Sequence, residues 1–210
     1  MSDIAFIFDL DGTLIDSYGV IVSCLKQVYE EKGITLNEEE ILKEVLDTSV
    51  HFFIEDMENR YGIPFDELKE RYSSISNIKL ASIGPIKHAK EMLDYLKSKN
   101  IPLYIFTHRG VSTKATLLTT KINNYFDEVV TSLYGYPRKP YPDGLIYLID
   151  KYHLDKSKTY YVGDRSIDIE CASKAGIKSI LYLPHPEIVK PTNKETYIIK
   201  DLLDIKNIVK

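Results

Sequence analysis

Two aspartates separated by one leucine, Asp9 and Asp11, end an apolar stretch in the segment FIFDLDGTLIDS of residues 6–17. Carboxylates this close repel each other unless a cation or a shared proton lies between them. Gly12 and Thr13 follow directly, and an aspartate followed by glycine favours a turn. Gly12 also allows the backbone to approach a phosphate closely, because it has no side chain. The segment therefore predicts a strand that ends in an acidic turn, with a metal ion or a proton offsetting the charges.

Further polar side chains follow three other apolar runs. They are Thr107, His108 and Arg109 in FTHRG, Arg138 and Lys139 in RKPYP, and Asp164, Arg165 and Asp168 in GDRSID. Aspartate oxygens suit Mg²⁺, which prefers a few carboxylates together with the phosphate oxygens of a substrate. A hydroxyl, backbone N–H groups and a lysine suit a phosphoryl group. If these residues converge, they predict a magnesium-assisted phosphate site.

The elements that must position these residues alternate between strands and helices. Short apolar runs predict strands, namely IAFIF, PLYIFT, DEVVTS, TYYVGD and KSILYL. Amphipathic stretches predict helices over residues 85–100, 112–123, 142–154 and 166–176. Continuous apolar strands are typical of a parallel sheet that is covered on both faces. The fold class expected is therefore α/β, a doubly wound parallel sheet of Rossmann-like topology, in which ligands bind beyond the carboxyl ends of the strands.

Residues 17–80 interrupt this alternation, because they contain four helical stretches and no convincing strand. A crossover between parallel strands needs only a dozen or so residues with its helix. The surplus predicts an inserted helical module at 17–80 within a core made of 1–16 and 81–210. The module holds 7 lysines and arginines against 13 aspartates and glutamates, a net charge of −6, which leaves +2 for the core.

The four polar segments, in this order, resemble the motifs of the haloacid dehalogenase superfamily of phosphotransferases. DLDGTLIDS is similar to its first motif, Thr107 takes the hydroxyl position of the second, RKPYPDGL is similar to the third, and VGDRSID to the fourth. An insertion after the first motif also resembles the small α-helical cap of that superfamily. The nearest subgroup by architecture is the phosphoglycolate phosphatases, by analogy.

The resemblance implies a role for each matching residue. Asp9 would be the nucleophile that forms an aspartyl-phosphate, and Asp11 the general acid and base. Thr107 and Lys139 would hold the phosphoryl group, while Asp168 would support either the metal or Lys139. The metal-binding residues implied are Asp9, Asp11 through its backbone carbonyl, Asp164 and Asp168. The substrate-binding residues predicted are Gly12, Thr13, Thr107, His108, Arg109 and Lys139.

Two residues depart from the pattern of the superfamily. His108 stands where asparagine is frequent, and Arg165 stands where a small hydroxyl residue is common. Neither change removes a catalytic group. Both leave the class of substrate open.

Composition restricts the partners. The net charge of −4 over 210 residues argues against a general affinity for nucleic acid, and no apolar run approaches the ~20 residues that span a membrane. The stretch MSDIAFIFDL has no basic segment typical of a signal peptide, and Cys24 and Cys171 are too few for a disulfide framework. We expect a cytoplasmic protein that acts on a small phosphorylated metabolite.

Three functions remain open, and two others are disfavoured: a haloacid dehalogenase, and an inactive binding protein, against which the intact motifs argue. A Mg²⁺-dependent phosphatase leads. A sugar phosphomutase similar to β-phosphoglucomutase shares all four motifs and the cap, and a receiver-like signalling domain shares an acidic pocket with a threonine and a lysine. A haloacid dehalogenase is disfavoured, because such enzymes lack the second aspartate of the first motif, and Asp11 is present.

Overall fold

The computed structural model describes residues 4–209, so the first three residues of the N-terminal stretch lie outside it. The chain divides into two compact units. The core unit comprises Met1–Asp16 and Gly84–Lys210, and the helical unit comprises Ser17–Ile83. The role of the helical unit as a cap stays a prediction.

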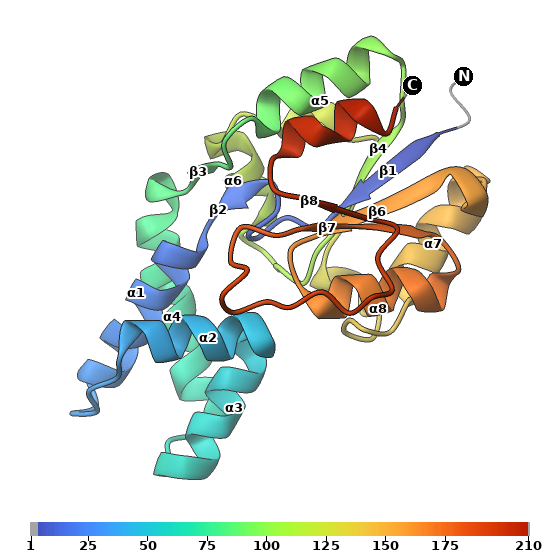
Figure 1. Cartoon of the computed structure of the whole chain (residues 1–210). Coiled ribbons are helices and arrows are strands. Elements are labelled where there is room, and N and C mark those ends of the chain that lie inside the picture. The colour runs from blue at the N-terminus through green and yellow to red at the C-terminus, as the bar shows by residue number, and fades with distance from the viewer. Residues whose placement is uncertain (1–3, 210) are drawn as a thin grey trace. The chain divides into compact units, whose positions relative to one another are not determined.

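A six-stranded sheet forms the centre of the core unit (Figure 1). The strand order is β5-β4-β1-β6-β7-β8, and every neighbouring pair is parallel. The strands are β1 (Ala5–Phe8), β4 (Leu103–Phe106), β5 (Glu128–Val130), β6 (Thr159–Gly163), β7 (Lys178–Tyr182) and β8 (Tyr197–Ile199). The prediction of a doubly wound parallel α/β sheet is confirmed.

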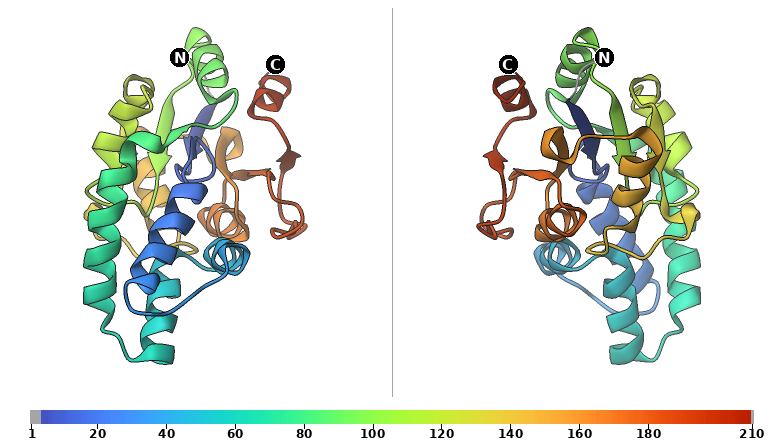
Figure 2. Two further views of the ribbon diagram at one scale, coloured as in Figure 1. Left: turned by 90° about the vertical axis from the view of Figure 1, so that its left-hand side faces the viewer. Right: turned by 90° about the vertical axis from the view of Figure 1, so that its right-hand side faces the viewer.

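Helices cover both faces of this sheet, which is why its strands read as continuous apolar runs. All four residues of β1 are buried. In Figures 1 and 2, α7 (Asp143–Tyr152) and α8 (Ser166–Ala175) lie together on one face. On the other face, α5 (Ala89–Ser98) lies beside the C-terminal 3-10 helix η5 (Leu202–Asn207). The remaining helices of the core are α6 (Thr113–Thr119) and the 3-10 turns η2 (Asn123–Tyr125), η3 (Ser132–Tyr134) and η4 (Lys156–Lys158).

The start of α5 differs from the prediction. The helix expected from residue 85 begins at Ala89, because His88 adopts a left-handed conformation with φ 63°. Gly84–Pro85 instead form β3, which pairs antiparallel with β2 (Ile15–Asp16). Sequence reasoning missed this two-residue ribbon, through which the chain leaves and re-enters the core unit.

The helical unit consists of four helices and one 3-10 turn. They are α1 (Tyr18–Glu30), α2 (Glu38–Asp47), α3 (Val50–Tyr61), α4 (Phe65–Ile78) and η1 (Lys79–Ser82). Apolar side chains such as Leu25, Phe53 and Leu68 are fully or almost fully buried within it. The Asn37 side chain caps α2 by accepting hydrogen bonds from the backbone N–H groups of Glu39 and Glu40. Among residues 4–209, no helix is both long enough and apolar enough to cross a bilayer.

Candidate active site

The turn after β1 is wound tightly by its backbone. The N–H groups of Leu14 and Ile15 both donate to the Leu10 carbonyl, at 3.0 and 3.1 Å. Gly12 has φ 78°, a left-handed conformation that a side chain would strain. Asp9 and Thr13 are buried, whereas Asp11 is partly exposed. The turn thus directs its two carboxylates into different surroundings.

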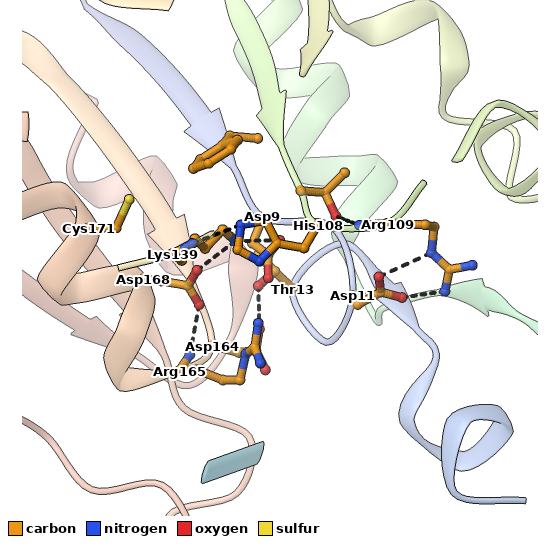
Figure 3. Close-up of polar contacts among 12 residues, drawn as sticks. Asp9, Asp11, Thr13, His108, Arg109, Lys139, Asp164, Arg165, Asp168 and Cys171 are labelled. Atoms are coloured by element: carbon orange, nitrogen blue, oxygen red, sulfur yellow. Dashed lines mark hydrogen bonds and ion pairs between the residues drawn. The ribbon is translucent and has the colours of Figure 1, made fainter. Parts of the chain in front are cut away.

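Three carboxylates from different parts of the core unit converge at this edge of the sheet (Figure 3). Asp9 follows β1, Asp164 follows β6, and Asp168 lies in the first turn of α8. One ligand oxygen of each lies within 4.8 Å of those of the other two. All three residues are buried. The order of the strands explains the meeting, because β1 and β6 are neighbours in the sheet.

Lys139 carries the positive charge within this cluster. Its Nζ lies 2.8 Å from Asp9 Oδ1 and 2.8 Å from Asp168 Oδ1. The same ammonium lies 5.4 Å from the ring centre of Phe106 and 5.3 Å from that of Tyr161, which are cation–π distances. Burial alone would lower the pKa of Lys139, but the charges of Asp168 and Asp9 outweigh it and the pKa is raised. Lys139 therefore remains protonated.

Asp9 has one oxygen without a partner. Its Oδ2 is buried and has no hydrogen bond among residues 4–209. Burial raises the pKa of Asp9, an effect that the Lys139 ammonium offsets only in part. An unsatisfied carboxylate oxygen beside two other buried aspartates is the donor set that a hard divalent cation prefers. The residues present thus fit a bound Mg²⁺.

Several hydrogen bonds hold the Asp168 carboxylate in place. Its Oδ1 accepts a hydrogen bond from the Tyr161 hydroxyl at 3.3 Å, and its Oδ2 accepts one from the Arg165 N–H at 3.2 Å. With Lys139, this gives the carboxylate three donors. Of the two supporting roles that the resemblance implied, the contacts favour the one toward Lys139.

The two threonines predicted to bind substrate are engaged with the protein. The Thr13 hydroxyl donates to Asp164 Oδ1 at 2.8 Å, so this threonine orients a carboxylate of the cluster. Thr107 is 1% exposed, and its Oγ1 accepts a hydrogen bond from the Arg109 N–H at 3.2 Å.

Asp11 lies outside the three-carboxylate cluster. The Arg109 guanidinium binds it with both Nε, at 3.1 Å from Oδ2, and Nη2, at 2.5 Å from Oδ1. The third nitrogen of this guanidinium, Nη1, donates to the hydroxyls of Ser112 and Thr116 at 3.3 Å each. This forked geometry fixes the plane of the Asp11 carboxylate.

His108 contacts the lysine loop rather than an aspartate. Its Nε2 lies 2.9 Å from the backbone nitrogen of Lys139 and accepts its hydrogen bond. Burial, followed by the charges of Lys139, Arg138 and Arg165, lowers the pKa of His108 to about 2. The imidazole is therefore neutral.

Sequence reasoning missed Phe106 and Tyr161, whereas it placed Gly163 in the fourth motif, at the exit of a strand. The first two lie in strands and read as ordinary core residues, so the sequence offers no signal for their position beneath Lys139. The close packing at Gly163 was not predicted, because it depends on the structure: a β-carbon there would lie 2.4 Å from the β-carbon of Asp168. The roles predicted for the matching residues stay predictions.

Comparison with known proteins shows the family and the fold of this chain. Residues 6–182 match the model of the haloacid dehalogenase-like hydrolase family. Pyrophosphatase PpaX of Oceanobacillus iheyensis is 28% identical, over 100% of this chain and 98% of that protein. A phosphoglycolate phosphatase of Aquifex aeolicus is 27% identical, over 84% of this chain and 83% of that protein. A haloacid dehalogenase-like family hydrolase from Streptococcus pneumoniae has the same fold, with a TM-score of 0.82, 21% identity and full coverage of both chains.

Proposed function

Because this chain belongs to the haloacid dehalogenase-like hydrolase family, we propose that it is a Mg²⁺-dependent phosphatase of small phosphomonoesters. The predicted superfamily membership and the expectation of a hydrolytic enzyme are confirmed by the family match. The observation that carries the proposal is the state of Asp9, with one buried oxygen on Lys139 and the other without a partner.

In the first step, Asp9 attacks the phosphorus of the substrate. A bond forms between a carboxylate oxygen and phosphorus, and the bond from phosphorus to the leaving oxygen breaks. Lys139 lies where it can offset negative charge on the transferring group. Asp11 gives a proton to the leaving oxygen, and this proton transfer yields a neutral alcohol.

In the second step, water releases phosphate from Asp9. Asp11 takes a proton from the attacking water, whose oxygen forms a bond to phosphorus while the Asp9 oxygen departs. Arg109 holds the Asp11 carboxylate by two hydrogen bonds and so keeps it directed for this step, in which Asp11 acts as the base.

The proposed Mg²⁺ would be held by Asp9 and Asp164, with the backbone carbonyl of Asp11 as a further ligand. Bound there, it supplies positive charge that allows a carboxylate and a phosphate to approach each other. Thr13 orients Asp164 for this purpose. Asp168, with its three donors, acts mainly through Lys139.

The name of one relative favours a second substrate class. Pyrophosphatase PpaX is similar over the full length of this chain, so inorganic pyrophosphate is a candidate beside phosphoglycolate. A phosphomutase and a receiver-like phospho-aspartate domain remain alternatives. We further propose that the helical unit acts as a cap that selects small substrates, and a cytoplasmic location stays a prediction.

The test is phosphate release by the purified protein from a panel that contains phosphoglycolate, a sugar phosphate and pyrophosphate. We expect turnover that needs Mg²⁺ and stops in a chelator. Asp9→Asn should lower turnover by several powers of ten, because the amide is a poor nucleophile. Asp150→Asn, which changes an exposed aspartate on α7, should not lower it.

Three outcomes would contradict the proposal. Wild-type turnover in Asp9→Asn would remove the covalent mechanism. An isomerised sugar phosphate without free phosphate would indicate a mutase. A phosphorylated Asp9 that persists for hours without turnover would indicate a receiver-like domain.

A further inference from the structure

The loop that carries Lys139 has little regular structure of its own. Between β5 and α7, residues 131–142 contain only the short turn η3. A local hydrogen bond joins the Tyr141 N–H to the Arg138 carbonyl at 3.0 Å. A lysine on such a loop needs an anchor from outside it if its ammonium is to stay in one place.

His108 provides that anchor. The Lys139 N–H donates to His108 Nε2 at 2.9 Å, across 31 positions of the chain. His108 lies two residues after β4 in the sequence, so the contact ties the loop to the central sheet. The ammonium of the same lysine is fixed at its other end by Asp168 Oδ1, at 2.8 Å.

The Phe106 ring contacts both the His108 ring and the Lys139 ammonium. The His108 ring packs edge-on against Phe106, with 5.7 Å between ring centres and an interplanar angle of 87°. The same phenyl ring lies beneath the Lys139 ammonium. Gly144 in α7 leaves space for it, because a β-carbon there would lie 2.4 Å from the ring. The imidazole is thus packed as well as hydrogen-bonded.

The hydrogen bond also defines the protonation of the imidazole. Nε2 accepts from an N–H, so it carries no proton, and the neutral ring holds its proton on Nδ1. The lowered pKa agrees with this state. A histidine in this state cannot donate a proton from Nε2 to a leaving group.

We propose that His108 is a positioning residue, whose Nε2 fixes the Lys139 backbone and thereby holds the Lys139 ammonium beside Asp9. This inference rests on the proposed phosphatase function for its effect on turnover. It assigns to His108 neither substrate contact nor acid–base chemistry, in contrast to the substrate-binding role predicted from the sequence.

The test compares two substitutions of similar size. His108→Phe keeps a ring against Phe106 but removes the acceptor, while His108→Gln keeps an acceptor oxygen. We expect His108→Phe to lower kcat at least tenfold and to weaken inhibition by orthovanadate, and His108→Gln to stay within about threefold of wild type. The loss should be equal for an alkyl phosphate and for nitrophenyl phosphate, because Lys139 acts on the phosphoryl group that both share.

A control separates positioning from general destabilisation. Ile205→Ala removes buried side-chain volume in η5 and should lower Tm without lowering kcat of the folded protein. Amide hydrogen exchange adds a readout that needs no activity. The Lys139 amide should exchange at least tenfold faster in His108→Phe than in wild type, and close to the wild-type rate in His108→Gln.

The results that would overturn the inference are distinct from failure of the proposed function. Unchanged kcat in His108→Phe, an equal loss in His108→Gln, or a larger loss for the alkyl ester each contradicts it. If wild type releases no phosphate from any substrate, the proposed function fails. In that case the exchange rate of the Lys139 amide tests by itself whether His108 anchors the Lys139 backbone. An unchanged exchange rate in His108→Phe would overturn that inference.

Discussion

Asp9 and Asp11 lie in different surroundings, which suit the different tasks that we propose for them. Asp9 lies among buried charges with an unsatisfied oxygen, whereas Asp11 is partly exposed and held by a guanidinium. A nucleophile needs an accessible lone pair, and a proton carrier needs a fixed direction. Only one leucine lies between the two residues. Their side chains nevertheless reach different surroundings, because the turn at Gly12 is tight.

The partly buried, neutral His108 predicts a pH dependence of stability. Its pKa is about 2 in the folded protein and about 6.5 in an unfolded chain. Between these values the unfolded chain binds a proton that the folded protein does not, so stability falls as pH decreases below ~6.5, by about 1.4 kcal/mol per pH unit. From pH 7 to pH 5 this amounts to about 2 kcal/mol.

His108→Gln lacks this contribution, while the other titrating groups are common to both proteins. Urea unfolding at pH 7 and pH 5 should therefore show a loss of stability about 2 kcal/mol smaller in the variant than in wild type. An equal loss in the two proteins would mean that the imidazole is protonated in the folded state.

The types and spacing of residues were sufficient to predict the charged members of the site. The carboxylates at 9, 164 and 168 and the lysine at 139 come together as expected from the strand ends. The contacts of the uncharged members were not predictable. The Thr13 hydroxyl could equally have faced a ligand, and only the packing of β1 against β6 brings it to Asp164.

At the scale of elements, the junction of β6 and α8 determines where Asp168 lies. Gly163 ends β6, and a β-carbon at this position would lie 2.4 Å from the β- and γ-carbons of Asp168. Gly163→Ala should therefore push Asp168 away from Lys139. Overpacking of this kind costs about 1–3 kcal/mol.

We expect Gly163→Ala to lose stability by that amount in urea unfolding and to lose most of its phosphatase turnover. Gly19→Ala is the matched control, since its β-carbon would meet no atom within 4 Å and alanine favours a helix. A Gly163→Ala protein with normal turnover would show that the junction tolerates a displaced Asp168.

Strong periodicity predicted the existence of elements better than their ends. The four helices of the helical unit and five of the six main-sheet strands were expected. β8 was missed because a loop without a helix connects its three residues to β7. The alternation of strand and helix patterns, on which the prediction was based, is therefore absent there. The left-handed His88 that delays α5 has a hydrogen bond between its side chain and that of Asp201, 113 positions away. The sequence around a residue does not indicate such long-range contacts.

At the scale of the whole molecule, charge is distributed unevenly between the units. The segment 17–80 carries −6 and the rest of the chain +2. If the helical unit is the cap that we propose, acidic polymers are repelled by it and large substrates are excluded. Small esters would be affected less, because Lys139 and the proposed metal would offset their charge locally.

We therefore expect good turnover of phosphoglycolate or a sugar phosphate and negligible turnover of an acidic phosphopeptide. Salt screens exposed charges beyond ~10 Å at 0.1 M, so a preference based on size should persist at high ionic strength. Efficient hydrolysis of the phosphopeptide at either ionic strength would contradict the proposal that the helical unit acts as a cap.

The position of β1 in the middle of the sheet has a consequence during protein synthesis. β1 leaves the ribosome before both of its partners, since β4 and β6 begin only at Leu103 and Thr159. At 5–20 residues per second, β6 follows β1 after roughly 8–30 s. The helical unit, whose elements all lie between residues 17 and 83, can complete its own core long before. During that interval β1 can pair with β4 but lacks β6, its partner on the other side, so a nascent chain halted before Thr159 would offer this open strand edge to chaperones and proteases.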